Sequence, residues 1–432
     1  MGLTTSSRRS FLKQSAAACA VLTGLSVARS AHAQGSGSIK IGLIGCGGRG
    51  LGAAKQALET GKDVKLVAVG DYFKSKAQRG LENLRKALPE QVDVPAEQIF
   101  DGFQNDLGVI ASEADVILIA CAAKFHPLYT KRAIEAGKHV FVEKPNAIDA
   151  AGIHMLEEAV AIARKKGLSF LAGLHSRYQP QYQEIIEQIH NGVIGEIRAM
   201  QCNYLRAPYG IRGSYEGISE LDFQVYNQYV FHWLSGDDFI QSLIHNLDRM
   251  FWALNGKLPT AAYGMGGRAA SFGHKYGNVF DHHSVVFEFG NDNCILTAAC
   301  RTQTGCYNNA SDYIFGTKGM TDWRVIRGET QRRFQGAPRG GHAEEQVALF
   351  DALRKGERID SGDYVVNSTM MGILGQMACY TGQKIMWKDL YDSKFVVKPA
   401  PEECIAGMDP PVVPGPDGLY PVPIPGQPHA WW

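Results

Sequence analysis

The chain has 432 residues, of which 45% are hydrophobic and 20% charged, a composition that allows two folded domains and excludes an intrinsically disordered protein. Its 44 lysines and arginines nearly balance its 43 aspartates and glutamates, so it lacks the basic field that recruits nucleic acids or anionic membranes. We therefore expect a small-molecule partner, no nucleic acid and no membrane span.

Residues 1–33 have the three regions of an export signal. Arg8 and Arg9 precede a short apolar run that ends in the small-residue pattern Ala31-His32-Ala33. The paired arginines resemble the bacterial twin-arginine signal, which carries folded proteins and often cofactor-containing redox enzymes. We predict a mature chain in the periplasm, or otherwise exported by this route. An N-terminal amphipathic helix is the alternative.

The cysteines give little sign of a disulfide framework or a cysteine metal site. Eight of the nine follow the signal, and no two have C-x-x-C spacing. Cys294, Cys300 and Cys306 are evenly spaced, which favours small core residues on one face of a strand. A chain that folds before export is also not expected to depend on disulfides.

A glycine-rich motif follows the first predicted strand, residues 39–44, and precedes a predicted helix, residues 51–58. In this context the motif G-x-G-x-x-G allows a tight turn and close approach of a pyrophosphate, whose charge the helix N-terminus stabilises. The next predicted strand, residues 64–69, leads to Asp71, placed where a carboxylate binds adenine ribose hydroxyls. The predicted dinucleotide site comprises Gly45, Cys46, Gly47, Gly48, Arg49, Gly50 and Asp71.

The nature of the nucleotide depends on the charges near Asp71. A carboxylate at this place repels a 2′-phosphate, which favours NAD over NADP. Arg49 and Lys74 are cations close enough in sequence to weaken that preference, so NADP stays open.

Strand and helix patterns alternate through the rest of residues 34–176, as in a Rossmann dinucleotide-binding domain. Strands are predicted over residues 114–122, 139–142 and 168–175, with helices over 131–137 and 149–166. Glu143 and Lys144 directly follow the second of these strands and would face the ligand crevice, or else form a surface ion pair. His126 is predicted in a loop at the same edge.

Residues 39–50, Asp71, the stretch from His126 to Val140, and Glu143-Lys144-Pro145, in this order, resemble the Gfo/Idh/MocA family of nicotinamide-dependent oxidoreductases. The resemblance covers most of the mature chain. It implies that Lys144 lies by the nicotinamide and the reacting carbon, and that the Lys144–Pro145 peptide is cis. We accordingly assign His126, Glu143 and Lys144 to the cofactor site and Lys144 to catalysis.

The sequence pattern changes over residues 177–398 and predicts an α+β domain with a large, mostly antiparallel open sheet. Strand-like segments at 198–204, 261–268, 284–289 and 295–300 lack intervening βα alternation, and helices are predicted at 342–355 and 364–380. The overall fold class is therefore α/β, with a Rossmann domain followed by this second domain. The resemblance implies that the free sheet face carries subunit contacts in a homo-oligomer.

Apolar residues recur at helical spacing over residues 236–254 and predict one continuous helix. Gln241, His245, Asp248 and Arg249 share another face, which suits a cleft wall or, alternatively, a solvated surface. The resemblance implies that His245 works with Lys144 in proton transfer, normally with an acidic residue four positions earlier. Gln241 stands there instead and cannot raise the pKa of the histidine by charge, although Asp248 could partly substitute.

The substrate contacts are predicted from polar and aromatic side chains near this helix and near the crossover at residues 176–180. Tyr209, Tyr215, Tyr226, Tyr229 and Trp233 could stack on a sugar ring or simply pack. Asp281, His282 and His283, with His232, are an unfavourable metal set because neighbouring strand residues face opposite ways, so no metal is predicted. The predicted substrate-binding residues are Arg177, Tyr178, Tyr204, Gln241 and Asp248.

Residues 399–432 contain ten of the 18 prolines and predict an extended arm that clasps a neighbouring subunit, covers the active site or stays loosely ordered. For the whole chain we predict an exported NAD(P)-dependent oxidoreductase acting on a hydroxyl of a sugar, glycoside or polyol. The alternatives are a glycosidase or epimerase that oxidises a ring hydroxyl transiently, and a non-catalytic sugar-binding protein. Because a free nicotinamide pool is not expected outside the cytoplasm, the cofactor is predicted to be retained.

Overall fold

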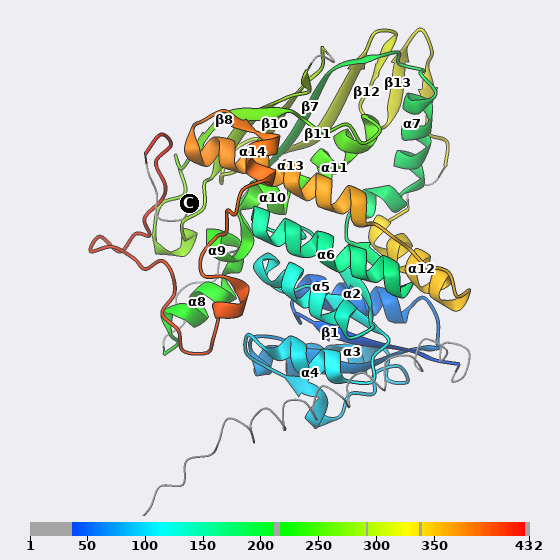
Figure 1. Cartoon of the computed structure of the whole chain (residues 1–432), viewed down its shortest axis with the longest axis vertical. Coiled ribbons are helices and arrows are strands. Elements are labelled where there is room, and N and C mark those ends of the chain that lie inside the picture. Colours follow the sequence, from blue (N-terminus) through cyan, green and yellow to red (C-terminus); the bar gives the residue numbers. More distant parts are fainter. Residues whose placement is uncertain (1–36, 211–216, 291–292, 337–338, 428–432) are drawn as a thin grey trace, which may run out of the picture.

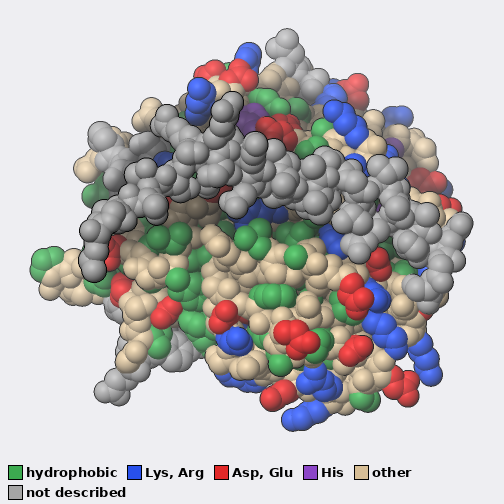
Figure 2. All heavy atoms as spheres, turned by 60° about the horizontal axis from the view of Figure 1, so that its bottom comes forward, with side chains coloured by type: hydrophobic (Ala, Val, Ile, Leu, Met, Phe, Trp, Pro, Cys, Tyr) green, Lys and Arg blue, Asp and Glu red, His purple; other side chains and the backbone are tan. Residues whose placement is uncertain are grey.

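Two β-sheets and their helices make up the computed structural model, which describes residues 37–210, 217–290, 293–336 and 339–427 (Figure 1). The predicted export signal lies outside the described residues, as do Tyr215 and the two terminal tryptophans. On the face drawn in Figure 2, basic and acidic side chains are interspersed over the surface, as expected from the nearly balanced charge.

The first sheet is the predicted parallel Rossmann sheet, with strand order β3-β2-β1-β4-β5-β6. Its strands are short apolar segments covered by helices on both faces, so they are almost wholly buried. The order reverses between β1 and β4, which is where ligands bind at the carboxyl ends of such sheets. The strands are β1 Ile39–Ile44, β2 Val64–Gly70, β3 Ile99–Phe100, β4 Val116–Ile119, β5 His139–Val142 and β6 Phe170–Ala172.

Helices from both halves of the sequence cover this sheet. One of them, α12, comes from far along the chain and packs its apolar side chains Leu349, Phe350 and Leu353 into the core around β1 and β5. Its N-terminal turn is thereby placed near the end of β5. The covering helices are α2 Gly48–Leu58, α3 Lys74–Ala87, α4 Asn105–Ala111, α5 His126–Glu135, α6 Ala150–Lys166 and α12 Gly341–Arg354.

The second sheet has nine strands in the order β14-β13-β12-β11-β7-β10-β9-β8-β15 and is mostly antiparallel, as predicted, with one parallel pair between β7 and β10. Helices α11 Ile244–Ala253 and α13 Gly362–Thr381 pack on one face. The central strands are β7 Ile197–Arg206, β8 Ala261–Gly267, β9 His282–Glu288, β10 Ile295–Thr302 and β11 Asn309–Gly316. The outer strands are β12 Gly319–Thr321, β13 Val325–Gly328 and the edge strand β14 Arg332–Arg333 beyond β11, and the edge strand β15 Ile385–Met386 beside β8.

The remaining helices are short or connect the two sheets. Among the described residues, no helix is both long enough and apolar enough to cross a membrane. The connecting helices are α7 Pro180–His190, α8 Glu220–Tyr226, α9 His232–Ser235 and α14 Trp387–Tyr391, together with the 3₁₀ turns η3 Ala123–Phe125, η4 His175–Tyr178, η5 Gln228–Val230 and η8 Pro401–Glu403.

The prediction of one continuous helix over residues 236–254 is wrong. Helix α10, Asp238–Gln241, is separated from α11 by a turn, and α10 itself begins only after Asp237, whose carboxylate accepts a hydrogen bond from the Phe239 amide. Asp237 has a φ of 157° and cannot continue a helix from Gly236. The apolar periodicity suggested a single helix because α10 and α11 each bury an apolar face.

Two smaller predictions are also corrected by the backbone. His126 is the first residue of α5 and not a loop residue, because the helix begins five residues before the predicted start at residue 131. Cys294 and Cys300 are buried as predicted, but Cys306 lies in the exposed connection after β10 and not on the strand face.

Residues 399–427 of the proline-rich arm pack on their own chain, so a loosely ordered tail is excluded for this part. Val412 and Tyr420 are buried. At the start of the arm, Lys124 donates a hydrogen bond from Nζ to the Val397 carbonyl at 2.6 Å, and the Val397 amide donates to Asp149. The arm then runs beside α8, where the Gln224 side chain donates to the Val412 carbonyl (Figure 1).

Candidate active site

The glycine turn between β1 and α2 forms one wall of a groove at the carboxyl edge of the first sheet. Gly45 has a φ of 95°, and a Cβ on Gly50 would lie 1.8 Å from the Gly45 carbonyl oxygen, so both positions require glycine. Gly48 faces open space, since a Cβ on this residue would meet no other atom within 4 Å. The turn therefore fits a pyrophosphate that approaches the backbone closely.

Asp71 lines the same groove at the end of β2, as predicted. One oxygen of its carboxylate accepts a 2.7 Å hydrogen bond from the Cys46 amide, and the other accepts one from the Phe73 amide. Lys76, which the sequence reasoning missed, lies 3.6 Å from the carboxylate and partly neutralises it. The arrangement suits an adenine ribose, with Lys76 beside it. Selection against the 2′-phosphate of NADP is therefore weaker than Asp71 alone would give.

Helix α8 and the turn η5 form the opposite wall of the groove, although they belong to the second half of the chain. The Tyr72 hydroxyl donates a 2.8 Å hydrogen bond to Asp222, and the Phe73 ring lies 5.5 Å from the ring of Tyr226. Lys76 also lies 5.9 Å from the Tyr226 ring centroid. These contacts bridge the adenine end of the groove. We call residues 219–230 the groove cover.

The arm braces the groove cover from behind. The buried side chain of Gln224 donates to the Val412 carbonyl at 2.6 Å and accepts from the Trp233 indole at 2.8 Å. Tyr420 hydrogen-bonds to Glu220 and packs edge-on against Phe231 at 5.0 Å. Displacing the cover would therefore break buried contacts on its rear side as well.

The turn Glu143-Lys144-Pro145 follows β5, and its lysine–proline peptide is cis, as the resemblance implied. Lys144 donates a 2.7 Å hydrogen bond from Nζ to the Gln241 carbonyl, which fixes the amine against α10. His126 lies behind the turn, with Nδ1 2.7 Å from the Pro145 carbonyl oxygen. It therefore positions the turn rather than presenting its ring to the groove.

His245 stands in the first turn of α11, four residues after Gln241 at the end of α10. Burial and then the nearby charge of Lys144 lower the pKa of His245 well below its usual value, so the imidazole is neutral at neutral pH. Its Nδ1 is buried without a hydrogen-bond partner among the described residues. Burial likewise lowers the pKa of the Lys144 amine.

Gln241 does not hold the imidazole with its side chain. Its amide nitrogen donates to the Ser235 carbonyl at 2.9 Å, and its contribution to the site is the backbone carbonyl that accepts from Lys144. Asp248 also does not replace the missing acid, because it forms a bidentate pair with Arg177 and accepts from the Ser368 hydroxyl. Neither Gln241 nor Asp248 therefore places an acidic group beside His245 that would raise its pKa.

The other predicted substrate residues lie in supporting positions. Arg177 stacks on the Tyr364 ring, 3.8 Å from its centroid, while paired with Asp248. Tyr178 packs against the core that contains α12. Tyr204 lies opposite Cys300 on the helix-covered side of β7, and burial raises the pKa of its phenol.

A polar network that the sequence did not reveal flanks the Lys144–Gln241 contact. Arg206 pairs with Asp238, which accepts a 2.8 Å hydrogen bond from the Ser242 hydroxyl. Arg206 also lies 3.6 Å from the Tyr209 ring centroid, and Tyr209 stacks on Tyr229 at 4.4 Å. Thus two of the aromatics considered for sugar stacking pack on each other, while both line the groove.

A row of three imidazoles begins at His245. The ring of His175 lies 4.5 Å from that of His245 and 4.1 Å from that of His342. His175 follows β6, so the rule that ligands gather at the carboxyl ends of parallel strands would have singled it out. His342 lies on α12, and no sequence signal links it to a residue 97 positions earlier.

The metal set considered from the sequence is engaged in structural contacts. Asp281 accepts hydrogen bonds from the Ala269, Ala270 and Ser271 amides. His283 is buried and pairs with Asp237 at 2.7 Å, whereas the side chain of His282 on the opposite face is 41% exposed.

Residues 39–174 match the family model described as "Oxidoreductase family, NAD-binding Rossmann fold", Gfo/Idh/MocA. Among curated relatives, inositol 2-dehydrogenase of Pseudomonas savastanoi pv. phaseolicola is 28% identical over 204 residues, 47% of this chain and 56% of that protein. D-glucoside 3-dehydrogenase of Escherichia coli is 31% identical over 171 residues, 40% of this chain and 44% of that protein. The chain thus spans about half the length of the curated relatives it matches.

Solved structures share the fold over both domains. Apo scyllo-inositol dehydrogenase from Lactobacillus casei has a TM-score of 0.60 at 19% identity and covers 81% of this chain and 98% of its own. GenD2 from gentamicin A biosynthesis, in complex with NAD, has a TM-score of 0.61 at 15% identity and covers 81% and 96%. The likeness extends the fold assignment beyond the segment that matches the family.

Proposed function

We propose that the protein oxidises or reduces a hydroxyl-bearing carbon of a sugar, glycoside or polyol, since residues 39–174 match the Gfo/Idh/MocA model of NAD-binding oxidoreductases. The observation that carries the proposal is the placement of Lys144. Its amine lies at the carboxyl end of β5 and donates to the carbonyl of Gln241, four residues before His245 in the sequence. An amine and a neutral imidazole beside a nucleotide groove suit proton transfer at an alcohol.

His245 acts as the base in this proposal, since a neutral imidazole can accept the hydroxyl proton. Lys144 orients the hydroxyl and stabilises the negative charge that develops on its oxygen, and the two roles can be exchanged. When bound, the nicotinamide supplies the hydride acceptor or donor. The glycine turn and Asp71 hold the rest of the nucleotide.

The substrate class rests on the relatives. Inositol 2-dehydrogenase and D-glucoside 3-dehydrogenase are named for a cyclic polyol and a glycoside. Arg206, Tyr209 and Ser242 add donors and an aromatic face near Lys144, a combination suited to a ring with several hydroxyls.

We further propose that the nucleotide stays bound through many turnovers. The groove cover is fastened to the first domain at Tyr72 and Phe73 and braced by the arm, so release requires these contacts to open. Retention would serve an exported enzyme, which has no ready nicotinamide pool.

The cover can be tested with Tyr226→Ala, which removes the ring that faces Phe73 and Lys76 across the groove. Loss of about 1.4 kcal/mol of contact free energy would speed nucleotide dissociation about tenfold. The measurement is dissociation of bound nucleotide by rapid dilution, compared with Tyr307→Ala, which removes an exposed ring that does not line the groove. Equal rates of nucleotide dissociation in both variants and the wild type would show that the groove cover does not retain the nucleotide.

A retained nucleotide also favours a second candidate, a closed cycle in which a ring hydroxyl is oxidised, a group is eliminated or inverted, and the hydride returns. This would make the protein a glycosidase or epimerase without net redox change. The groove cover is the observation that favours it, because a closed cycle needs no exchange of nucleotide.

One experiment separates these functions. The purified protein is denatured and the supernatant analysed for nicotinamide nucleotide, and the native protein is then given a panel of glycosides and polyols. Net oxidation supports the dehydrogenase, whereas aglycone release or epimerisation without reduced nucleotide supports the closed cycle. A protein that neither holds nor takes up nucleotide would be a sugar-binding protein instead.

We propose that the chain is exported by the twin-arginine route, on the sequence pattern of Arg8 and Arg9. Changing both arginines to lysine should keep the precursor inside the cell, while the wild type is recovered in the periplasm. Fractionation with an antibody against the chain reports the distribution. Undiminished export of the lysine variant would exclude this route.

We also propose a homo-oligomer formed through the open face of the second sheet. Tyr263, Met265, Ile295 and Phe315 are exposed there, an apolar surface that a subunit contact would cover. Light scattering of the mature chain should give a multiple of the monomer mass, and Met265→Lys should shift it toward the monomer. A monomeric wild type would contradict this assembly.

A further inference from the structure

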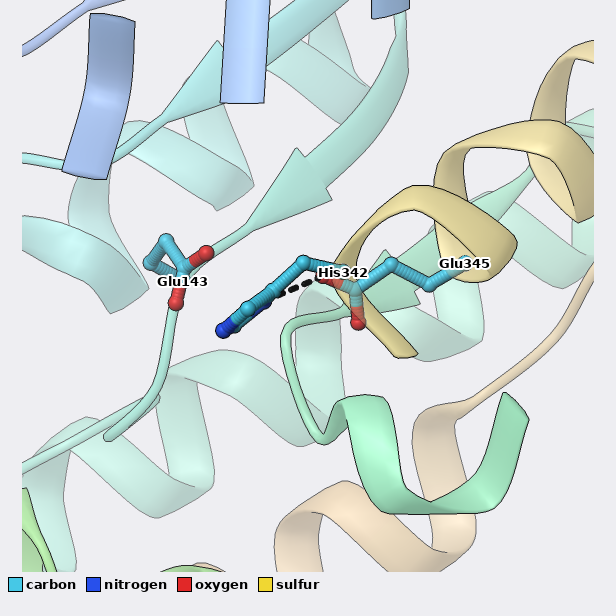
Figure 3. Close-up of side chains that lie close together, drawn as sticks. All are labelled: Glu143, His342 and Glu345. Carbon is cyan, nitrogen blue, oxygen red and sulfur yellow. Dashed lines mark hydrogen bonds and ion pairs between the residues drawn. The ribbon is translucent and has the colours of Figure 1, made fainter. Parts of the chain in front are cut away.

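Two buried glutamates and a histidine meet beside the active site, from elements far apart in the sequence. Glu143 follows β5, and His342 and Glu345 lie near the N-terminus of α12. One ligand atom from each of the three lies within 4.8 Å of the other two. Figure 3 shows the imidazole of His342 reaching from α12 toward the Glu143 carboxylate, with Glu345 bonded on its other side.

The carboxylates lack the partners that burial demands. Glu143 is 3% exposed and Glu345 is fully buried. Both oxygens of Glu143 and Oε2 of Glu345 have no hydrogen-bond partner within the described ranges. A buried ionised carboxylate without partners is strongly unfavourable, so these oxygens point to a ligand that the protein residues do not supply.

The nearby cations do not fill this need. Arg49 lies 3.1 Å from one oxygen of Glu143. Its positive charge can balance one carboxylate, but the charge of Glu345 then has no counterpart. Lys144 directs its ammonium to the Gln241 carbonyl. An additional positive species between Glu143 and Glu345 would balance the cluster.

Two carboxylate oxygens and one imidazole nitrogen are the donor set of a first-row divalent cation. Zinc sites with three protein ligands and one open position use such mixed sets, and manganese accepts them as well. An imidazole is a poor choice for magnesium or calcium, which prefer oxygen ligands only. The ring of His175 packs against that of His342 at an interplanar angle of 50° and restrains its orientation, as residues behind metal ligands commonly do.

We propose that Glu143, His342 and Glu345 bind one divalent transition-metal ion, with Zn²⁺ or Mn²⁺ as the matching chemistry. The ion would tie the turn after β5 to α12, and so fix the residue that precedes Lys144. The site goes beyond the proposed oxidoreductase function and does not depend on it. The competing occupant is a proton shared between the two carboxylates.

The test uses the full mature chain, purified with a tag that lacks histidine and without chelators. Elemental analysis should find about one Zn²⁺ or Mn²⁺ per chain, and calorimetry after chelation should show Zn²⁺ rebinding to one site. Glu345→Gln and His342→Ala should each weaken Zn²⁺ binding about 100-fold or more. Glu344→Gln is the matched control, since it lies in the same helical turn and pairs with Arg339 instead.

Thermal unfolding distinguishes the ion from the shared proton even if a variant is poorly folded. Zn²⁺ should raise the Tm of the chelated wild type and of Glu344→Gln, but not that of Glu345→Gln. Absence of stoichiometric metal and of a Zn²⁺-dependent Tm shift in the wild type would overturn the proposal. Equal Zn²⁺ affinity in Glu345→Gln and the wild type would do so too. Neither measurement depends on nucleotide or catalytic turnover.

Discussion

Lys144→Met should lower kcat/KM by about 10²- to 10⁴-fold, the range found when a proton-transfer group or a charge-stabilising donor is removed. The thioether chain keeps the apolar stem of the lysine and its packing, but it cannot donate to the Gln241 carbonyl or to a substrate oxygen. The reaction would be followed by nicotinamide absorbance, or by product analysis if the cycle is closed. The amount of nucleotide that the protein binds should be unchanged, because the contacts proposed for the glycine turn and Asp71 do not involve Lys144.

The control for this variant is Lys86→Met, an exposed lysine on α3 in the same domain, which should keep full activity. Lys144→Arg should not restore activity, since a guanidinium carries its charge on a planar group that cannot occupy the place of one ammonium. Circular dichroism and the amount of bound nucleotide verify the fold. A Lys144→Met enzyme within about threefold of the wild type would exclude Lys144 from the chemistry.

The sequence was most informative where function and local structure depend on neighbouring residues. The boundaries of β1 and β5 follow directly from short apolar runs, and the glycine turn with Asp71 follows from backbone demands of a dinucleotide site. Lys144 and His245 could be paired only through the family resemblance. The backbone contact through Gln241 explains how the two come together.

Long-range packing is what the sequence could not show. Glu345 reaches Glu143 because α12, which lies far beyond β5 in the sequence, buries Leu349 and Phe350 on the first sheet. The position of Tyr226 over the groove depends similarly on the arm behind Gln224. Neither contact leaves a periodic signal, since each is decided by which apolar faces meet in three dimensions.

The break before α10 has the same origin and coincides with a buried ion pair. His283 on β9 lies 2.7 Å from Asp237, and both side chains are at most 1% exposed. Asp237 also accepts from the Phe239 amide, so it begins the helix whose end carries Gln241. A histidine on a distant strand therefore decides where the α10 and α11 segment starts.

His283→Ala should lower the free energy of unfolding by about 3–5 kcal/mol, because it leaves Asp237 buried without its partner. His282→Ala is the control and should cost about 1 kcal/mol or less, since its side chain is half-exposed. Urea unfolding of the three proteins gives the comparison. Asp237→Asn in the His283→Ala background should recover part of the loss, because a neutral amide is less costly to bury than a carboxylate.

The pH dependence makes this expectation specific. Burial would raise the pKa of Asp237, but His283, together with His232 and the Phe239 amide, outweighs that effect and holds the pKa below its ordinary value, with Tyr380 also near the carboxylate. A depressed carboxyl pKa contributes stability above the unfolded-state pKa and loses it as the pH falls through the folded-state pKa. Without His283 that contribution is absent and protonation relieves the buried charge. The difference in free energy of unfolding between wild type and His283→Ala should therefore narrow as the pH falls from about 7 toward about 4, the ordinary carboxyl range. A difference that stays constant would show that lost packing, not the ion pair, causes the destabilisation.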